Sequence, residues 1–286
     1  MLGAQEGDVT TAADFSVKFW GVRGTVSTPV ASHLRYGGNT TCLEVRCGER
    51  LLILDGGTGI RSLGNELAAK GGVVDADIFF THTHVDHIAG LPFFRPMYDP
   101  KSQLRLWAGH LAPELSLNDI LCRMMSAPLF PVPFEILAAA NTTIDFRAGE
   151  SFEPSPGVRL RTAPLNHPNR ATGYRIEFGG KSICFVTDTE HVPGKPDRTI
   201  LDLIAGTDIF IYDCTYTDEE YKGRVGWGHS TWQEGIRLAD MAHAKTLVIF
   251  HHDPDHDDAF MDRVASDADK ARPGTLVARE GLVLHP

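Results

Sequence analysis

The stretch Thr81-His82-Thr83-His84-Val85-Asp86-His87 directly follows the apolar run Ile78-Phe79-Phe80. A strand projects alternate side chains to one face, so His82 and His84 can point together, while Asp86 and His87 follow on the turn into the next segment. Histidine nitrogens and carboxylate oxygens are the donors that zinc and similar divalent cations prefer. Because one four-coordinate ion rarely takes so many ligands from one turn, the stretch predicts a site for two metal ions at a strand end.

The composition is that of a globular protein with an acidic surface. The chain has 286 residues, of which 42% are hydrophobic, and a formal net charge of -10 from 27 basic and 37 acidic residues. This charge argues against an extended nucleic-acid surface. The five cysteines form no Cys-x-x-Cys pair, and no apolar run is long enough to cross a bilayer, so we expect reduced thiols, no membrane partner and a cytoplasmic location.

Short β-rich runs alternate with helical patterns along most of the chain. Residues 1–14 are expected to be a flexible N-terminal tail, and residues 15–286 a single domain. Strands are predicted at 16–21, 42–47, 51–54, 77–81, 104–108, 159–163, 174–178, 182–187, 209–212 and 246–250. Helices are predicted near 59–70, 88–97, 112–125, 198–205, 231–243 and 257–271. The turns Cys47-Gly-Glu-Arg50 and Phe178-Gly-Gly-Lys181 indicate hairpins, so two mixed sheets with helices outside, an α/β (α+β) fold, fit best.

The sequence does not match three other functional motifs. The turn Gly56-Gly-Thr-Gly59 has Ser62 where a dinucleotide site needs its third glycine, although the neighbouring Asp55 could support the metal site from behind. Gly180-Lys181-Ser182 precedes a strand and not a helix, so it is not a phosphate loop. The chain has no Gly-x-Ser-x-Gly motif and therefore no serine-hydrolase signature.

Further donors follow other apolar strands. His167 comes just after the predicted strand 159–163, Asp188 ends the strand 182–187, and His251 ends the strand 246–250. Each residue alone could be an ordinary polar loop residue. Their shared position after apolar strands predicts that they complete the metal site at the same rim.

The series Thr81-His-x-His-x-Asp-His87, His167, Asp188 and His251, in this order, resembles the metallo-β-lactamase fold superfamily of binuclear metal hydrolases. The resemblance implies an αββα sandwich with the site at the sheet rim. It also implies that His82, His84 and His167 hold a first metal ion, that Asp86, His87 and His251 hold a second, and that Asp188 bridges them. Two divalent ions are expected, with zinc first and manganese or iron as the other candidates.

Within this superfamily, Gly228-His229-Ser230-Thr231 and Tyr212-Asp213-Cys-Thr-Tyr216 look like ribonuclease Z and related phosphodiesterases. The resemblance implies that Asp213 fixes the tautomer of His229, and that His229 protonates the leaving oxygen or stabilises charge at phosphorus. With Asp86, these two are the candidate catalytic residues. Ribonuclease Z carries a protruding arm between the motifs that match His167 and Asp188, and residues 168–187 leave no room for it.

The expected function is hydrolysis of a small phosphodiester, such as a cyclic nucleotide, by a hydroxide held between two metal ions. A thioester or lactone hydrolase of the same superfamily remains an alternative, and so does a binding or sensor module without turnover. The loop 27–36 and the insertion 110–133 are candidates for specificity. In the insertion, Met124, Met125, Leu129 and Phe130 could form an apolar wall, or could be core or the surface of a homodimer.

Overall fold

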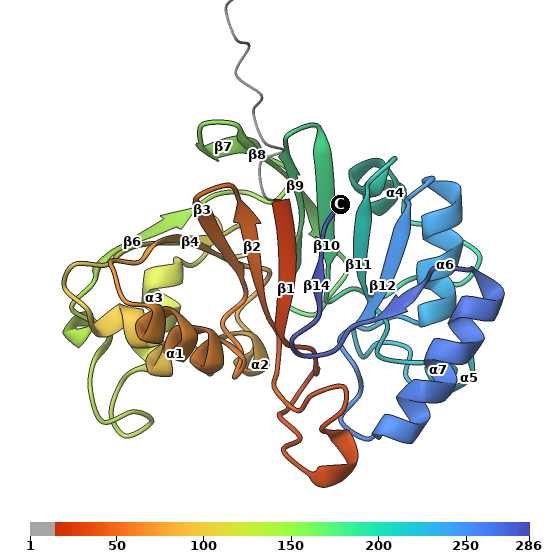
Figure 1. Cartoon of the computed structure of the whole chain (residues 1–286), viewed down its shortest axis with the longest axis horizontal. Helices are drawn as coiled ribbons and strands as arrows, with labels where there is room; N and C mark the ends of the chain where they lie inside the picture. Colours follow the sequence, from red (N-terminus) through yellow and green to blue (C-terminus); the bar gives the residue numbers. More distant parts are fainter. Residues whose placement is uncertain (1–14) are drawn as a thin grey trace, which may run out of the picture.

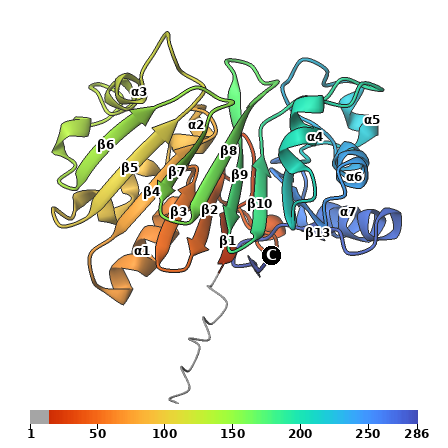
Figure 2. The same cartoon turned by 90° about the horizontal axis from the view of Figure 1, so that it is seen from above.

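The computed structural model describes residues 15–286, which form two seven-stranded sheets packed face to face between two layers of helices (Figures 1 and 2). The predicted tail, residues 1–14, lies outside the described residues, and the single domain stays a prediction. The first sheet has the order β14 (Val283–Leu284), β1 (Phe15–Gly21), β2 (Cys42–Cys47), β3 (Arg50–Leu54), β4 (Asp75–Phe80), β5 (Gln103–Ala108) and β6 (Ala140–Asp145). The second has the order β13 (Leu276–Val277), β12 (Thr246–Phe250), β11 (Ile209–Asp213), β10 (Lys181–Val186), β9 (Ala171–Phe178), β8 (Val158–Leu165) and β7 (Ser151–Ser155).

Both sheets are mixed, as the hairpin signals predict. β3, β4, β5 and β6 run parallel, and so do β10, β11, β12 and β13, while the other neighbouring pairs are antiparallel. In the β9–β10 hairpin Phe178 pairs with Lys181, and Gly179 and Gly180 have φ of 57° and 76°. Two successive positive φ angles are what a two-residue hairpin of this kind requires, and glycine adopts them without a steric cost.

The helices cover the outer faces of the sheets. They are α1 (Ile60–Lys70), α2 (Val85–Ile88), α3 (Leu117–Met124), α4 (Arg198–Ile204), α5 (Asp218–Tyr221), α6 (Trp232–Met241) and α7 (Asp258–Ala271). Figure 1 shows α1 and α3 on the side of the first sheet and α4, α6 and α7 on the side of the second. Short 3-10 helices span Ala31–His33, Leu91–Phe93, Arg95–Tyr98 and Phe134–Ile136. No helix within residues 15–286 is long and apolar enough to span a membrane.

Alternating side chains build three apolar layers. In β10, Ile183 and Phe185 enter the core between the sheets, whereas Cys184 and Val186 pack under the helices of the second sheet. In β4, Phe79 joins the core between the sheets, and its neighbour Phe80 packs under the helices of the first. Both faces of these strands are therefore buried, which explains their continuous apolar sequences. The predicted αββα sandwich is confirmed.

Two predicted helices differ from the observed ones. The helix expected at 88–97 is replaced by the end of α2 and two 3-10 helices, because Pro92 and Pro96 lack the N–H groups that a continuous α-helix needs. The helix expected at 112–125 begins only at Leu117, because Ser116 caps its N-terminus by accepting a hydrogen bond from the N–H of Asp119. The strands β6, β7, β13 and β14 were not predicted from the sequence.

The strand ends decide where the site lies. β3 and β4 are parallel, so Asp55 and Thr81 leave the first sheet at the same edge. β10, β11 and β12 are parallel in the second sheet, so Asp188, Asp213 and His251 also follow strands that end at one edge. Figure 1 shows these ends at the lower rim of the sandwich, near α2. The polar residues that follow the apolar strands therefore converge.

Candidate metal centre

All seven predicted ligands lie together at the rim. His82 and His84 follow β4, and Asp86 and His87 belong to the first turn of α2. The remaining three come from the second sheet, where they follow β8, β10 and β12; they are His167, Asp188 and His251. Their donor atoms form two neighbouring sets, and in each set the atoms lie within 4.8 Å of one another.

The first set contains His82, His84 and His167. Nε2 of His167 lies 3.1 Å from Nδ1 of His84. Oδ2 of Asp188 lies 3.7 Å from Nε2 of His82 and 3.7 Å from Nε2 of His167. Three imidazole nitrogens and one carboxylate oxygen thus surround one point.

The second set contains Asp86, His87, Asp188 and His251. The other oxygen of Asp188, Oδ1, lies 3.4 Å from Nε2 of His87 and 3.2 Å from Nε2 of His251. Oδ2 of Asp86 lies 3.3 Å from Nε2 of His87 and 3.5 Å from Nε2 of His251. Asp188 therefore turns one oxygen toward each set.

These separations fit a pair of metal ions. Donor atoms about 2.1 Å from a tetrahedral ion lie about 3.4 Å apart, close to the spacings within the two sets. The Nε2 atoms of His82, His87 and His251 are buried and have no hydrogen-bond partner among residues 15–286. Leaving a buried polar atom unpaired costs free energy, and a metal ion at each set would satisfy these atoms. The donor set thus fits two divalent cations.

The second ring nitrogen of each facing imidazole is held by another group. Nδ1 of His87 lies 2.8 Å from Oδ2 of Asp55, the residue that the sequence places behind the site. Nδ1 of His167 donates to the carbonyl of Gly228 at 2.8 Å, and Nδ1 of His251 lies 3.0 Å from Oγ1 of Thr215. Such contacts fix the ring orientation and direct Nε2 toward the ion.

The pKa shifts follow from burial and from the carboxylates. Burial lowers the pKa of His82 well below its ordinary value, and it also lowers the pKa of His84 and of His167. Neutral imidazole is the form that binds metal. Burial alone would raise the pKa of Asp188, but the surrounding histidines, His251 first, hold it well below its ordinary value. This carboxylate therefore stays ionised.

Asp213 and His229 lie beside the two sets. Nδ1 of His229 lies 3.0 Å from Oδ2 of Asp213 and 3.8 Å from Oδ2 of Asp188. Burial would lower the pKa of His229, but the carboxylate of Asp213, followed by those of Asp188 and Asp86, overrides this effect and raises the pKa to about 9. Asp213 also accepts a hydrogen bond from the N–H of Thr189 at 3.0 Å, so the pair is held rigidly.

Sequence reasoning missed two residues that shape the centre. A Cβ on Gly24 would lie 2.3 Å from Cε1 of the His251 ring, so this position must be glycine for the ring to stay in place. Glu190 accepts hydrogen bonds from the N–H of Gly226 at 2.8 Å and from the N–H of Gly228 at 2.7 Å. It thereby fixes the loop that leads to His229. No local sequence pattern marks either residue.

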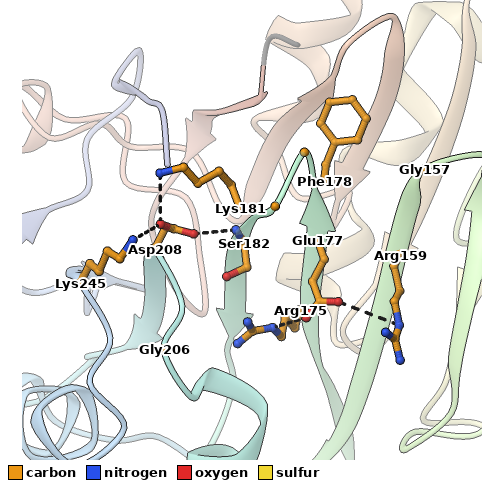
Figure 3. Close-up of a pocket in the computed structure, with 12 residues that line it drawn as sticks. Gly157, Arg159, Arg175, Glu177, Phe178, Lys181, Ser182, Gly206, Asp208 and Lys245 are labelled. Atoms are coloured by element: carbon orange, nitrogen blue, oxygen red, sulfur yellow. Dashed lines mark hydrogen bonds and ion pairs between the residues drawn. The ribbon is translucent and has the colours of Figure 1, made fainter. Parts of the chain in front are cut away.

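A polar cavity of about 520 Å³ lies at the other end of the second sheet (Figure 3). The lysine and arginine side chains that line this cavity each pair with a carboxylate. Lys181 and Lys245 contact Asp208 at 3.5 Å and 2.6 Å. Arg175 and Arg159 both face Glu177 in Figure 3, at 2.7 Å and 3.9 Å. These paired charges hold the β9–β10 hairpin against the neighbouring strands.

Comparison with known proteins agrees with this geometry. Residues 49–252 match the family described as Beta-lactamase superfamily domain. A ribonuclease Z of Parabacteroides distasonis is 27% identical over 62% of this chain and 51% of its own length, so the chain spans about half of that relative. A ribonuclease Z of Bradyrhizobium sp. is 25% identical over 89% of this chain and 95% of its own length.

Solved structures show the same fold at lower identity. The metallo-beta-lactamase fold protein YhfI of Bacillus subtilis has a TM-score of 0.71 and 18% identity over 94% of this chain and 98% of its own. A diphosphatase from the PhnP family has a TM-score of 0.69 and 19% identity, with 94% and 96% covered. The short form of human tRNase Z has a TM-score of 0.68 and 18% identity, with 94% and 98% covered.

The solved structures define the fold of this chain, which is the metallo-β-lactamase fold. The chain belongs to the Beta-lactamase superfamily domain family. The predicted resemblance is confirmed. The ligand and catalytic roles of the individual residues remain proposals, which the geometry above supports.

Proposed function

We propose that the chain is a binuclear metal-dependent phosphodiesterase. The observation that carries the proposal is the Asp213–His229 pair beside Asp188: Nδ1 of His229 is 3.0 Å from Asp213, and the imidazole has a pKa raised to about 9. A protonated imidazole next to a metal pair suits a reaction that expels an alkoxide from phosphorus, since it can both donate a proton and stabilise negative charge. The ribonuclease Z relatives support the same chemistry.

Two sets of residues would hold the ions, with zinc as the first candidate and manganese or iron as the others. His82, His84 and His167 would hold one ion, Asp86, His87 and His251 would hold the other, and Asp188 would contact both. When bound, the ions supply a water molecule whose pKa is lowered from 15.7 to about 7, together with positive charge for the phosphate.

The side chains around the ions orient one another and supply a proton to the leaving oxygen. Asp213 accepts a hydrogen bond from the protonated Nδ1 of His229, which leaves Nε2 to carry the second proton toward the leaving oxygen. The imidazole is only 12% exposed, so little water competes for this proton. Asp86 receives a hydrogen bond from the N–H of Thr25 at 2.8 Å, and this contact keeps its carboxylate directed into the site.

We propose a small phosphodiester as the substrate. Residues 171–186 are the hairpin of β9 and β10 with a two-residue turn, and only four further residues lie between His167 and Asp188, so no arm for a large RNA protrudes there. The acidic net charge of -10 points the same way. The ribonuclease Z relatives make RNA the competing substrate. A homodimer and a cytoplasmic location stay predictions.

A substrate panel with metal analysis tests the proposal. The protein would be loaded with zinc, manganese or iron(II), and assayed with bis(4-nitrophenyl) phosphate, cyclic nucleotides, a precursor tRNA, an acyl-glutathione thioester and lactones. We expect two ions per chain and the highest kcat/KM on a small phosphodiester. Faster turnover of thioesters or lactones would refute the proposal in favour of acyl hydrolysis, and two bound ions without any turnover would favour a binding module.

Two variants separate metal binding from proton transfer. Asp188→Ala should lose at least one ion and most of its activity, because it removes the carboxylate shared by both sets. His229→Ala should keep both ions and lose about 100-fold in turnover, the scale of a positioned acid. Two ions and full turnover in Asp188→Ala would show that the ligand assignment is wrong.

A further inference from the structure

An apolar cavity of about 530 Å³ opens next to the metal centre. Its wall comes from α2, from the 3-10 helix Leu91–Phe93, from α3 and from the loop after α3. Every lining residue except Arg123 is apolar, and among them are Val85, Phe93, Ile120 and Leu129. The volume lies within the range of about 300–1,000 Å³ that is usual for small-molecule sites.

The cavity borders the proposed active site. Val85, in its wall, stands in the chain between the candidate ligands His84 and Asp86. Ile120 lines this cavity and also a neighbouring one of about 490 Å³, which His82 and His84 line. A molecule whose phosphate lies at the metal centre can therefore extend across Ile120 or Val85 into the apolar cavity.

Part of the wall is unusually exposed. Val85 is 75% exposed, Leu129 is 77% exposed and Phe93 is 53% exposed. Single exposed apolar residues are ordinary, but several that line one concave surface beside a site indicate a binding surface. Met124 also lines the cavity, and its flexible side chain can adapt to ligands of different shape.

We infer that this cavity binds an aliphatic substituent of the phosphodiester substrate, so that the site acts on esters of apolar alcohols. The inference rests on the proposed function and names its substrate class. A nucleobase would suit the cavity less well, because only Arg123 could pair with its polar edge and the remaining N–H and C=O groups would lose their hydrogen bonds. Arg123 is exposed, so its guanidinium can stay in water while its stem covers apolar surface.

Three esters that share the same leaving group test the inference. We would compare 4-nitrophenyl methyl phosphate, 4-nitrophenyl hexyl phosphate and the 4-nitrophenyl ester of thymidine 5′-phosphate with the metal-loaded protein. The hexyl ester has five additional methylenes, and each one contributes about fourfold when it is fully buried. With about half of this area buried, kcat/KM for the hexyl ester should exceed that for the methyl ester about 30-fold.

A variant that replaces two exposed residues of the cavity wall tests the role of this wall. In the double variant Phe93→Ser/Leu129→Ser, the hexyl-to-methyl ratio of kcat/KM should fall below about 5, because much of the apolar wall is lost. The ratio does not depend on the fraction of active protein. Ile136 is 52% exposed and lies outside the cavity, so Ile136→Ser should keep the wild-type ratio.

The outcomes separate this inference from the proposed function. Hydrolysis of the methyl ester without a gain for the hexyl ester would overturn the inference and leave the function standing. The inference also fails, and the function stands, if the double variant keeps the wild-type ratio or if the thymidine ester is preferred over the hexyl ester. Failure to hydrolyse all three esters would overturn the proposed function, and the inference with it.

Discussion

Replacing Asp213 by asparagine should move the pH dependence of turnover. The carboxylate lies 3.0 Å from Nδ1 of His229 and makes the largest contribution to raising the pKa of this imidazole to about 9. The Asp213→Asn substitution keeps the size of the side chain, and the amide oxygen can still accept one hydrogen bond. It removes the negative charge and leaves the burial of His229 unchanged.

The structure gives the size of the effect. Raising the pKa of His229 from 6.5 to about 9 corresponds to about 3 kcal/mol in favour of the protonated ring. Asp213 makes the largest contribution that raises this pKa, ahead of Asp188 and Asp86, so its removal lowers the pKa and with it the protonated fraction of His229 at pH 8. Because less of the ring is protonated at pH 8, we expect turnover at this pH to fall by up to about 100-fold, the scale of a positioned acid.

The assay is kcat/KM from pH 5 to pH 10 with the metal-loaded protein. An acid works in its protonated form, so its contribution is present below its pKa and is lost as the pH rises through that value. Bound cations lower the pKa of His229 in both proteins, so the difference between the two profiles is the quantity to measure. The descending limb should lie about one to three pH units lower in Asp213→Asn, the usual effect of one close opposite charge, with partial recovery of activity near pH 5.

A matched control lies beside the other end of β11. Asp208 immediately precedes β11, at the end opposite to Asp213, and pairs with Lys245 at 2.6 Å. Asp208→Asn also removes a buried carboxylate, but it should keep the descending limb of the wild type. An unchanged limb in Asp213→Asn, at normal metal content, would refute the acid role of His229.

Three further predictions concern the support of the site and the stability of the fold. Gly24→Ala should lose at least one ion per chain by metal analysis, because the added Cβ meets the His251 ring at 2.3 Å, whereas Gly223→Ala has its nearest contact at 3.8 Å and should keep both ions. Glu190→Ala should keep both ions and KM but lose about tenfold or more in kcat, because the loop to the proposed acid loses two charge-assisted hydrogen bonds; an unchanged kcat would contradict this. Burial, and next the charge of a nearby arginine, lower the pKa of His252 to about 3, so its contribution to stability is present above about 6.5 and is lost as the pH falls toward 3. Urea unfolding in EDTA between pH 6 and pH 4 should therefore show a loss of about 1.4 kcal/mol per pH unit more in the wild type than in His252→Asn, and equal slopes would refute this.

The clustering of the candidate donors was predictable because most of them follow an apolar strand. The parallel strands β10 and β12 end at one edge, and β8 runs in the same direction because β8 and β10 are both antiparallel to β9, so His167, Asp188 and His251 could be placed at the rim without knowledge of their contacts. The pair Asp213 and His229 could be identified only through the resemblance to known phosphodiesterases. Their 16 positions of separation contain α5 and a loop whose path the sequence does not specify.

The missed features depend on contacts between distant segments. Gly24 must be small only because the ring of His251 packs against it, and Glu190 matters only because the loop before α6 folds back over it. The strand β6, which was not predicted, has the sequence Ala-Asn-Thr-Thr-Ile-Asp. Because most of these residues are polar, a search for apolar runs does not detect it. It forms nonetheless, because β5 offers it a parallel neighbour at the edge of the sheet.

The two candidate ion sites join the two sheets. His82 and His87 come from the first sheet, and Asp188 and His251 come from the second, so each ion would be held from both sides of the sandwich. The apolar core between the sheets does not depend on these residues and fixes the distance between the two strand edges. The fold therefore sets the spacing of the donors before any ion binds, and a preformed site of this kind needs little rearrangement to bind its ions.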